Sequence, residues 1–144
     1  MAEPEDRVSV SVDAAGLHDA AAFVAGFAAR HRLDEVERAR LLILVEELLT
    51  NLLKYGYAAE AARGRAEIAL RREGDHVVLE FADDGRPFDP VAAPPPDLDL
   101  PLDERPVGGL GLHLVRSLVE EARYERVGAR NRTTLLRRLG APPR

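Results

Sequence analysis

Five consecutive apolar residues, Leu41 to Val45, constrain the fold of this chain more than any other segment. They form the middle of a predicted helix that Asp34 can cap and that reaches about Tyr57. A helix that is apolar on nearly every side is stable only when other elements cover it. We therefore expect this helix to lie at the centre of the fold.

Hydrophobic periodicity predicts the elements around that helix. Short apolar or alternating runs predict strands over 8–12, 66–70, 76–81, 122–127 and 133–139. Apolar residues at helical spacing predict helices over 13–30, over 34–57 and from the glycines at 108–111 onward. The order strand, helix, helix, strand, strand, helix, strand, strand predicts an α+β fold. We expect a two-layer sandwich, in which helices cover one face of a mixed, mostly antiparallel sheet.

The composition is that of one globular domain, because 144 residues support a single hydrophobic core, which we place over 1–144. The absence of cysteine excludes a disulfide scaffold, a thiolate nucleophile and a zinc site built on cysteine. The net charge of -5 argues against direct nucleic-acid binding, which needs a basic footprint. The chain has no apolar stretch long enough to span a bilayer and no signal-peptide pattern at its start. We therefore expect a soluble, cytoplasmic protein.

Polar side chains interrupt the apolar helix at Glu47 and Asn51, which are four residues apart and share one face, near Lys54. A carboxylate and a carboxamide aimed at one point can hold a hard cation such as Mg2+. The carboxylate can also accept the proton of an attacking hydroxyl. The alternative interpretation is that this side of the helix simply faces water.

A second polar segment, Asp83-Asp84-Gly85, directly follows an apolar strand. An inward-facing Asp83 can accept a hydrogen bond from the amino group of adenine. Gly85 would let the backbone approach a flat base closely. The alternative interpretation is an ordinary turn, since Asp and Gly are typical turn residues.

A third segment, Gly108-Gly109-Leu110-Gly111-Leu112, opens a predicted helix. Backbone N–H groups and the positive end of the helix dipole favour phosphate at such a position. The proline-rich, acidic stretch before it, about 91–107, is predicted to be a mobile lid. A plain junction between a loop and a helix would give the same pattern, and the segment matches neither a P-loop nor a dinucleotide fingerprint.

The order of these three segments is more specific than any one of them, and it resembles the GHKL ATPase superfamily. Glu47 to Asn51 resembles its N box, Asp83 to Gly85 its first glycine box, and Gly108 to Leu112 its second. Thr134 lies where the family has a threonine that supports the adenine-binding aspartate. The resemblance extends from Val8 to Leu139.

Within the superfamily, the chain is most similar to small anti-sigma factors with serine-kinase activity. The similar segments are Gly56-Tyr57, Phe88-Asp89-Pro90 and the run from Gly108 to Val115. The chain departs from the pattern at Pro87, where the first glycine box usually has its second glycine. It also departs at Tyr55, where members of the subfamily often have histidine.

The resemblance implies a Bergerat-type pocket that binds ATP with Mg2+. It implies that Asn51 ligates the metal, that Asp83 recognises adenine and that Glu47 is the catalytic base for phosphoryl transfer. Arg105 can either sense the γ-phosphate or remain a solvated residue of the lid. The full nucleotide-binding set comprises Asn51, Lys54, Asp83, Gly85, Phe88, Arg105, Gly108, Gly109, Leu110, Gly111, Leu112 and Thr134.

The resemblance also implies partners. Such proteins silence a sigma factor and phosphorylate a serine of an antagonist with the STAS fold, and they pair as homodimers. The strand over 8–12 is a plausible edge for pairing. Two alternatives stay open: a nucleotide-responsive binding module without phosphotransfer, and a histidine-kinase catalytic domain. The second is disfavoured because the chain has no room for a dimerisation helix with a phospho-acceptor histidine.

Two groups of residues are expected to be unremarkable. The arginines between Arg123 and Arg138 mostly alternate with apolar residues, which is typical of the solvated face of strands. The four histidines lie far apart without ligand spacing, so we assign them no metal site.

Overall fold

The computed structural model describes residues 5–57, 64–89 and 109–144, and the side chains of all of these except 109–112. The elements in chain order are β1 (Glu5–Ser11), α1 (Ala14–Arg30), α2 (Glu35–Tyr55), β2 (Arg65–Glu73), β3 (His76–Asp83), α3 (Gly109–Leu118), β4 (Glu121–Val127) and β5 (Arg130–Arg138). This is the order that the hydrophobic periodicity predicts. None of the helices in the described part has both the length and the apolar composition to cross a membrane.

The five strands form one sheet in the order β1-β2-β3-β5-β4. Every neighbouring pair among the described strands is antiparallel, so the expectation of a mixed sheet is wrong. The physical reason is the position of β5. Strands β3 and β4 run in the same direction, but β5 lies between them and pairs with both.

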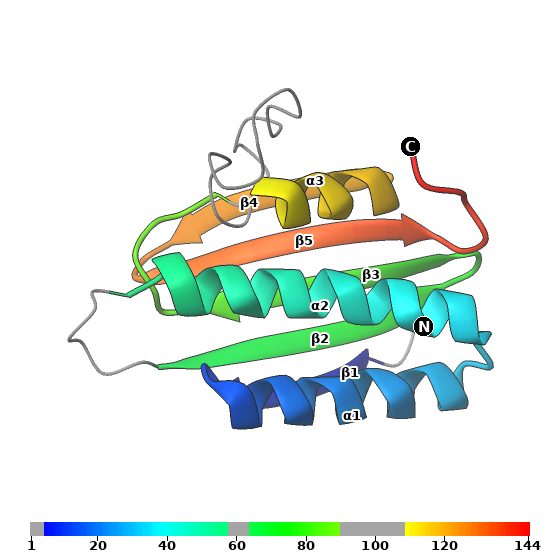
Figure 1. Cartoon of the computed structure of the whole chain (residues 1–144), viewed down its shortest axis with the longest axis horizontal. Coiled ribbons are helices and arrows are strands. Elements are labelled where there is room, and N and C mark those ends of the chain that lie inside the picture. Colours follow the sequence, from blue (N-terminus) through cyan, green and yellow to red (C-terminus); the bar gives the residue numbers. More distant parts are fainter. Residues whose placement is uncertain (1–4, 58–63, 90–108) are drawn as a thin grey trace.

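All three helices lie on one face of the sheet, as Figure 1 shows. Helix α1 follows the side of β1, α2 lies over the middle strands and α3 lies on the side of β4 and β5. The α+β, two-layer architecture predicted from the sequence is therefore confirmed.

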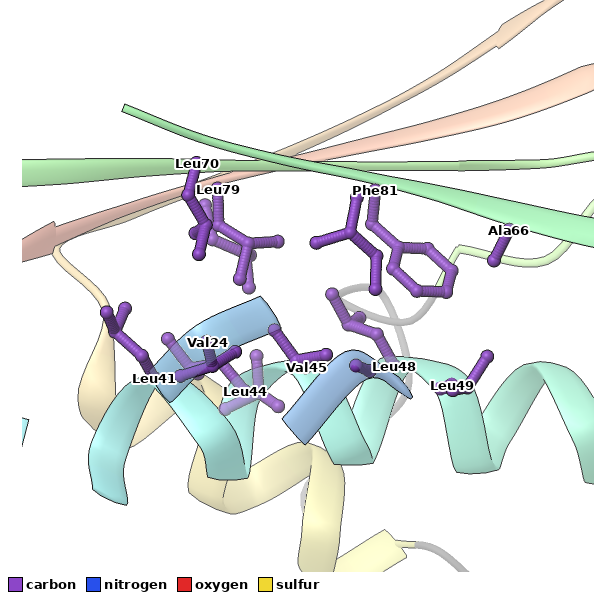
Figure 2. Packing of buried hydrophobic residues seen from close by; sticks show 14 of the residues in the cluster. Val24, Leu41, Leu44, Val45, Leu48, Leu49, Ala66, Leu70, Leu79 and Phe81 are labelled. Atoms are coloured by element: carbon purple, nitrogen blue, oxygen red, sulfur yellow. The ribbon is translucent and has the colours of Figure 1, made fainter. Parts of the chain in front are cut away.

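Helix α2 supplies the centre of the hydrophobic core, as expected. Leu41, Leu44 and Val45 are fully buried. Figure 2 shows them pointing at Leu79 and neighbouring side chains of the sheet. Leu42 and Ile43, by contrast, are only half-buried. Even this apolar helix therefore keeps one side partly exposed. The position of each polar residue around the helix decides whether it faces water or the core.

The two long helices begin where capping residues predict. The carboxylate of Asp34 accepts a hydrogen bond from the backbone N–H of Glu37 at 2.8 Å, and Asp13 accepts one from Gly16 at 2.8 Å. Helix α2 ends at Tyr55, with Gly56 as its C-cap. Asn51 consequently lies one turn before the end of α2, at the level where β3 ends.

Arg137 contradicts the expectation that the arginines of the last strands face water. Its side chain is 2% exposed and forms an ion pair with buried Glu37, from Nη2 to Oε1 at 2.9 Å. It also donates to the carbonyl oxygens of Leu118 at 2.8 Å and Ala141 at 2.7 Å. Arg137 follows Leu135 by two positions, so strand alternation turns both toward the helices. The pair ties the first turn of α2 to the end of α3 and to the C-terminal residues.

Candidate functional site

A pocket lies between the C-terminal end of α2, the end of β3, the turn after it, and β5. It is lined by Leu48, Asn51, Leu52, Gly56, Phe81, Asp83, Arg86, Phe88, Asn131 and Thr133. Three predicted nucleotide-binding residues, Asn51, Asp83 and Phe88, therefore meet in one pocket. They come from two separate parts of the sequence, the end of α2 and the end of β3 with the turn after it, which folding brings together.

Asn51 is 2% exposed and lines the pocket. Its Nδ2 donates to the carbonyl oxygen of Glu47, one turn earlier in α2, at 2.7 Å. Its Oδ1 is the one buried side-chain polar atom without a hydrogen-bond partner among the described residues. An unsatisfied buried acceptor costs free energy, so such an atom is normally retained because it has a ligand. An amide oxygen is also a type of ligand that Mg2+ prefers, so this residue fits the predicted metal.

Glu47 is half-buried on the same side of α2 but does not line the pocket. Burial raises the pKa of its carboxyl above the usual value for glutamate, the positive charge of Lys54 lowers it, and Glu46 raises it. Lys54 itself is exposed and lies outside the pocket lining. A carboxylate with a raised pKa is a stronger proton acceptor once it is ionised, which suits the predicted base.

Asp83, the last residue of β3, is 6% exposed and faces the helices. Its Oδ1 accepts hydrogen bonds from the backbone N–H of Gly85 at 2.9 Å and from Nδ2 of Asn131 at 2.9 Å. Burial raises the pKa of Asp83, while these two hydrogen bonds act in the opposite direction. Both bonds from described residues end on Oδ1, which leaves Oδ2 to accept a hydrogen bond from a ligand.

Gly85 lies where any side chain would clash. A Cβ atom there would be 2.8 Å from the carbonyl oxygen of Gly56 and 3.0 Å from both Asp83 and Leu52. The glycine therefore lets the turn after β3 pack against the end of α2. The bond from its N–H to Asp83 spans two residues within the same turn.

Aromatic and aliphatic side chains form the apolar part of the pocket. Phe88 lines it together with Leu48, Leu52 and Phe81. The ring centroid of Phe88 is 5.9 Å from that of Tyr55, so the two rings support each other at the rim. Walls of this kind suit a flat, partly apolar group such as a purine base.

Thr134 does not belong to this pocket, which corrects the sequence prediction. It pairs with Glu80 and lies on the opposite face of the sheet, beside Arg123 and Arg132. The preceding residue, Thr133, pairs with Phe81, is 3% exposed and lines the pocket. The error is one position, and a shift of one position in a strand moves a side chain to the other face.

The glycine segment is described only in part. Gly109 is the first residue of α3, so the glycines do open a helix as predicted. Leu110, Gly111 and Leu112 follow within that helix, and their side chains lie outside the described part. Arg105, Gly108 and the predicted lid over 91–107 also lie outside the described residues.

Sequence reasoning missed one group of site residues, which comes from β4 and β5. Asn131 is 3% exposed and contacts Asp83, and its Oδ1 accepts hydrogen bonds from Tyr124 and Arg126. The sequence feature that could have identified this group is the alternation of Asn131, Thr133 and Leu135 along the strand. It places a polar residue on the inward face of a strand, where it needs partners.

Comparisons with known proteins identify the family. A family model described as a histidine kinase-like ATPase domain matches residues 10–137. A protein named serine/threonine-protein kinase BtrW, from Bordetella bronchiseptica, is 30% identical over 135 residues, which cover 94% of this chain and 94% of that protein. This likeness extends along nearly the whole of both chains.

Among solved structures, the chain is similar to the crystal structure of the RsbU and RsbW domains of Rv1364c from Mycobacterium tuberculosis. The TM-score is 0.66 at 21% sequence identity. The match covers 98% of this chain and 34% of that one, so this chain spans about a third of that structure's length. At this identity the likeness shows a shared fold. The match over 10–137 and the Bordetella relative together show that the chain belongs to the histidine kinase-like ATPase domains of the GHKL superfamily.

Proposed function

We propose that this protein binds ATP with Mg2+, sequesters a sigma factor and phosphorylates a serine of a STAS-type antagonist of that complex. The observation that carries the proposal is that two side-chain oxygens which can accept from a ligand or bind a metal meet in one pocket. They are Oδ1 of Asn51, which has no protein partner among the described residues, and Oδ2 of Asp83. The first suits a metal-bound phosphate group and the second an adenine amino group.

Magnesium would be held by Asn51 together with phosphate oxygens of the nucleotide, because Mg2+ rarely has an all-protein site. When bound, the ion supplies charge neutralisation on the phosphates. The described residues contain no cluster of three or more acidic or histidine side chains that would bind a metal by themselves. The nucleotide and the metal should therefore bind together rather than separately.

Glu47 is the proposed base for transfer. The serine hydroxyl oxygen of the antagonist forms a bond to the γ-phosphorus of ATP, while the bond from that phosphorus to the β–γ bridging oxygen breaks. Glu47 accepts the hydroxyl proton, and ADP leaves with the electron pair of the broken bond. Positioning and charge neutralisation supply most of the catalysis in such reactions, so one carboxylate is sufficient.

The partner assignment rests on the resemblance of the sequence to small anti-sigma factors with serine-kinase activity. The Bordetella relative is named a serine/threonine-protein kinase, and the Mycobacterium structure contains a domain named RsbW. We also propose a homodimer, since β1 forms one edge of the sheet and is exposed at alternate positions. Light scattering should give twice the mass of the chain, and a monomer at high concentration would contradict the dimer.

One observation favours a second candidate, a nucleotide-responsive binding module without phosphotransfer. Glu47 does not line the pocket. In this case ATP would control capture of the sigma factor, and no serine would be modified.

Two experiments test the proposal. Calorimetry with ATP, with and without Mg2+, should give binding that depends on the metal, and no binding would refute the proposal. The protein is then incubated with labelled ATP, Mg2+ and a STAS-domain protein encoded beside it. Glu47→Gln should abolish label on serine while ATP binding persists.

Glu46→Gln is the matched control, because Glu46 is an exposed carboxylate one position away on α2. This variant should keep both binding and transfer. Intact ATP binding without label on serine in the unmodified protein would favour the binding module instead.

A further inference from the structure

Asn131 connects the end of β3 to the first part of the turn that follows it. Its Nδ2 donates to Oδ1 of Asp83 at 2.9 Å, to the carbonyl oxygen of Arg86 at 2.9 Å and to that of Gly85 at 3.3 Å. The side chain is 3% exposed, so water does not compete for these contacts. One amide nitrogen therefore holds both the carboxylate and the backbone that follows it.

Two side chains of β4 fix the orientation of that amide. The hydroxyl of Tyr124 and Nη1 of Arg126, the latter at 3.1 Å, both donate to Oδ1 of Asn131. Nη1 of Arg126 also donates to the carbonyl oxygen of Gly85 at 2.7 Å. A guanidinium has no acceptor, so the amide oxygen must face Arg126 and the amide nitrogen must face Asp83.

This arrangement determines which oxygen of Asp83 remains available. Oδ1 already has two donors, the N–H of Gly85 and Nδ2 of Asn131, so a ligand would meet Oδ2. The same donors favour the ionised carboxylate, which only accepts hydrogen bonds, over the protonated form, which burial favours. Arg126 adds a positive charge nearby, and Asp84 adds a negative one.

We propose that Asn131, locked by Tyr124 and Arg126, is a positioning residue that makes the pocket select a 6-aminopurine over a 6-oxopurine. The inference rests on the proposed ATP-binding function. A 6-amino group donates to a fixed carboxylate oxygen. A 6-oxo group places an acceptor against it, so both are left unpaired. Without Asn131, Asp83 can rotate or take up a proton and then donate to a carbonyl.

The test compares Mg2+-dependent binding of ATP and inosine triphosphate by calorimetry, because the two bases differ at position 6. The unmodified protein should prefer ATP. Asn131→Ala should weaken ATP binding by about tenfold to a hundredfold and leave the inosine nucleotide almost unchanged, since it removes support for one charged hydrogen bond. Arg132→Ala is the matched control, as Arg132 is exposed on the opposite face of the same strand. It should keep the preference.

Tyr124→Phe provides a milder variant that removes only one hydroxyl and keeps the ring. It should reduce the preference for ATP by up to about tenfold. If Asn131→Ala does not fold, this variant decides the question alone. Equal losses for both nucleotides in these variants would mean a purely structural role and would overturn the inference.

The outcomes separate this inference from the function on which it rests. If the unmodified protein prefers ATP and the variants keep that ratio, the inference fails while ATP binding stands. If the unmodified protein binds both nucleotides equally, Asp83 does not read position 6 and the inference fails in the same way. If it binds neither nucleotide, the proposed function fails first.

Discussion

A single amide oxygen, Oδ1 of Asn51, opposes folding and favours binding. It is buried without a hydrogen-bond partner in the described part of the chain. Leaving such a group unsatisfied costs about 1–3 kcal/mol, and a ligand that reaches it removes the cost. A protein with such a site is less stable without its ligand than it would be with an apolar residue at that position.

Replacing Asn51 with leucine should therefore separate stability from binding. Asn51→Leu removes the orphaned acceptor from an apolar pocket, and we expect the free energy of unfolding of the nucleotide-free protein to rise by about 1 kcal/mol. Mg2+-dependent ATP binding should be lost. Urea denaturation and calorimetry measure the two effects.

Asn51→Asp is the matched control, because it keeps an oxygen ligand but buries a charge. It should bind the metal and nucleotide and be less stable than the unmodified protein when empty. A leucine variant that is clearly destabilised would contradict this account of Asn51.

The raised pKa of Glu47 predicts how transfer depends on pH. Burial raises the pKa of the carboxyl, and the positive charge of Lys54 opposes this. Only the ionised form accepts a proton, so the rate should fall as the pH drops through this pKa, above the usual glutamate range. Lys54→Gln should raise the pKa further and move the acid limb of the rate profile to higher pH.

Lys54→Arg keeps the charge and should leave that limb in place. The rate of serine phosphorylation measured across the acidic range distinguishes these variants. If the acid limb of the rate profile lies at the same pH in the Lys54→Gln variant and in the unmodified protein, Glu47 is not the base.

At the scale of the elements, the pair Glu37–Arg137 joins helix α2 to strand β5 over 100 residues of sequence. Arg137 donates four hydrogen bonds, two to Glu37 and one each to the carbonyl oxygens of Leu118 and Ala141, so the buried charge is matched. Burial raises the pKa of Glu37, but hydrogen bonds from Arg137, Gly140 and Arg40 lower it below the usual value for glutamate. The pair therefore contributes stability only while Glu37 is ionised.

This gives a prediction with a defined sign. A lowered pKa in the folded state means that Glu37 stabilises the fold above its unfolded pKa, about 4.3, and that this contribution is lost as the pH falls through the folded value. Glu37→Gln should cost about 3–5 kcal/mol near neutral pH, because Arg137 remains buried without a counter-ion. Urea denaturation between pH 7 and pH 3 should show a flatter acid limb for this variant.

The double variant Glu37→Leu with Arg137→Leu is the control. It removes both charges, so it should recover much of the stability that Glu37→Gln loses. If the double variant is as unstable as the sum of the single variants, the loss reflects packing and not charge.

At the scale of the molecule, the pocket is built from residues of both the helical layer and the sheet. Asn51 comes from the helical layer, while Asp83 and Asn131 come from neighbouring strands. A ligand that contacts all three must stabilise the whole fold, because no single element contains the site.

Thermal unfolding checks this directly. At a concentration about 100 times its dissociation constant, Mg2+-ATP should stabilise the protein by about 2.7 kcal/mol and raise the Tm by about 5–10 °C. Asn51→Leu should abolish the shift, whereas Glu46→Gln should retain it. A shift of the same size with ATP in the absence of Mg2+ would contradict a shared metal and nucleotide site.

The sequence by itself predicted the order of the elements, the α+β sandwich, and Asn51 and Asp83 as inward-facing polar residues, which do line one pocket. These follow from local patterns, namely helical spacing, strand alternation and helix caps. Each of these patterns involves residues that are close together in the sequence, so the sequence is sufficient to predict them. The resemblance to the GHKL superfamily rested on the same short segments and is confirmed.

Only the tertiary structure decided the contacts between distant segments. It placed β5 between β3 and β4, turned Thr133 and not Thr134 into the pocket, and paired Arg137 with Glu37. It also brought Asn131 to Asp83, 48 residues away. The physical reason is that strand order and register depend on long-range pairing, and one residue of register decides which face a side chain occupies.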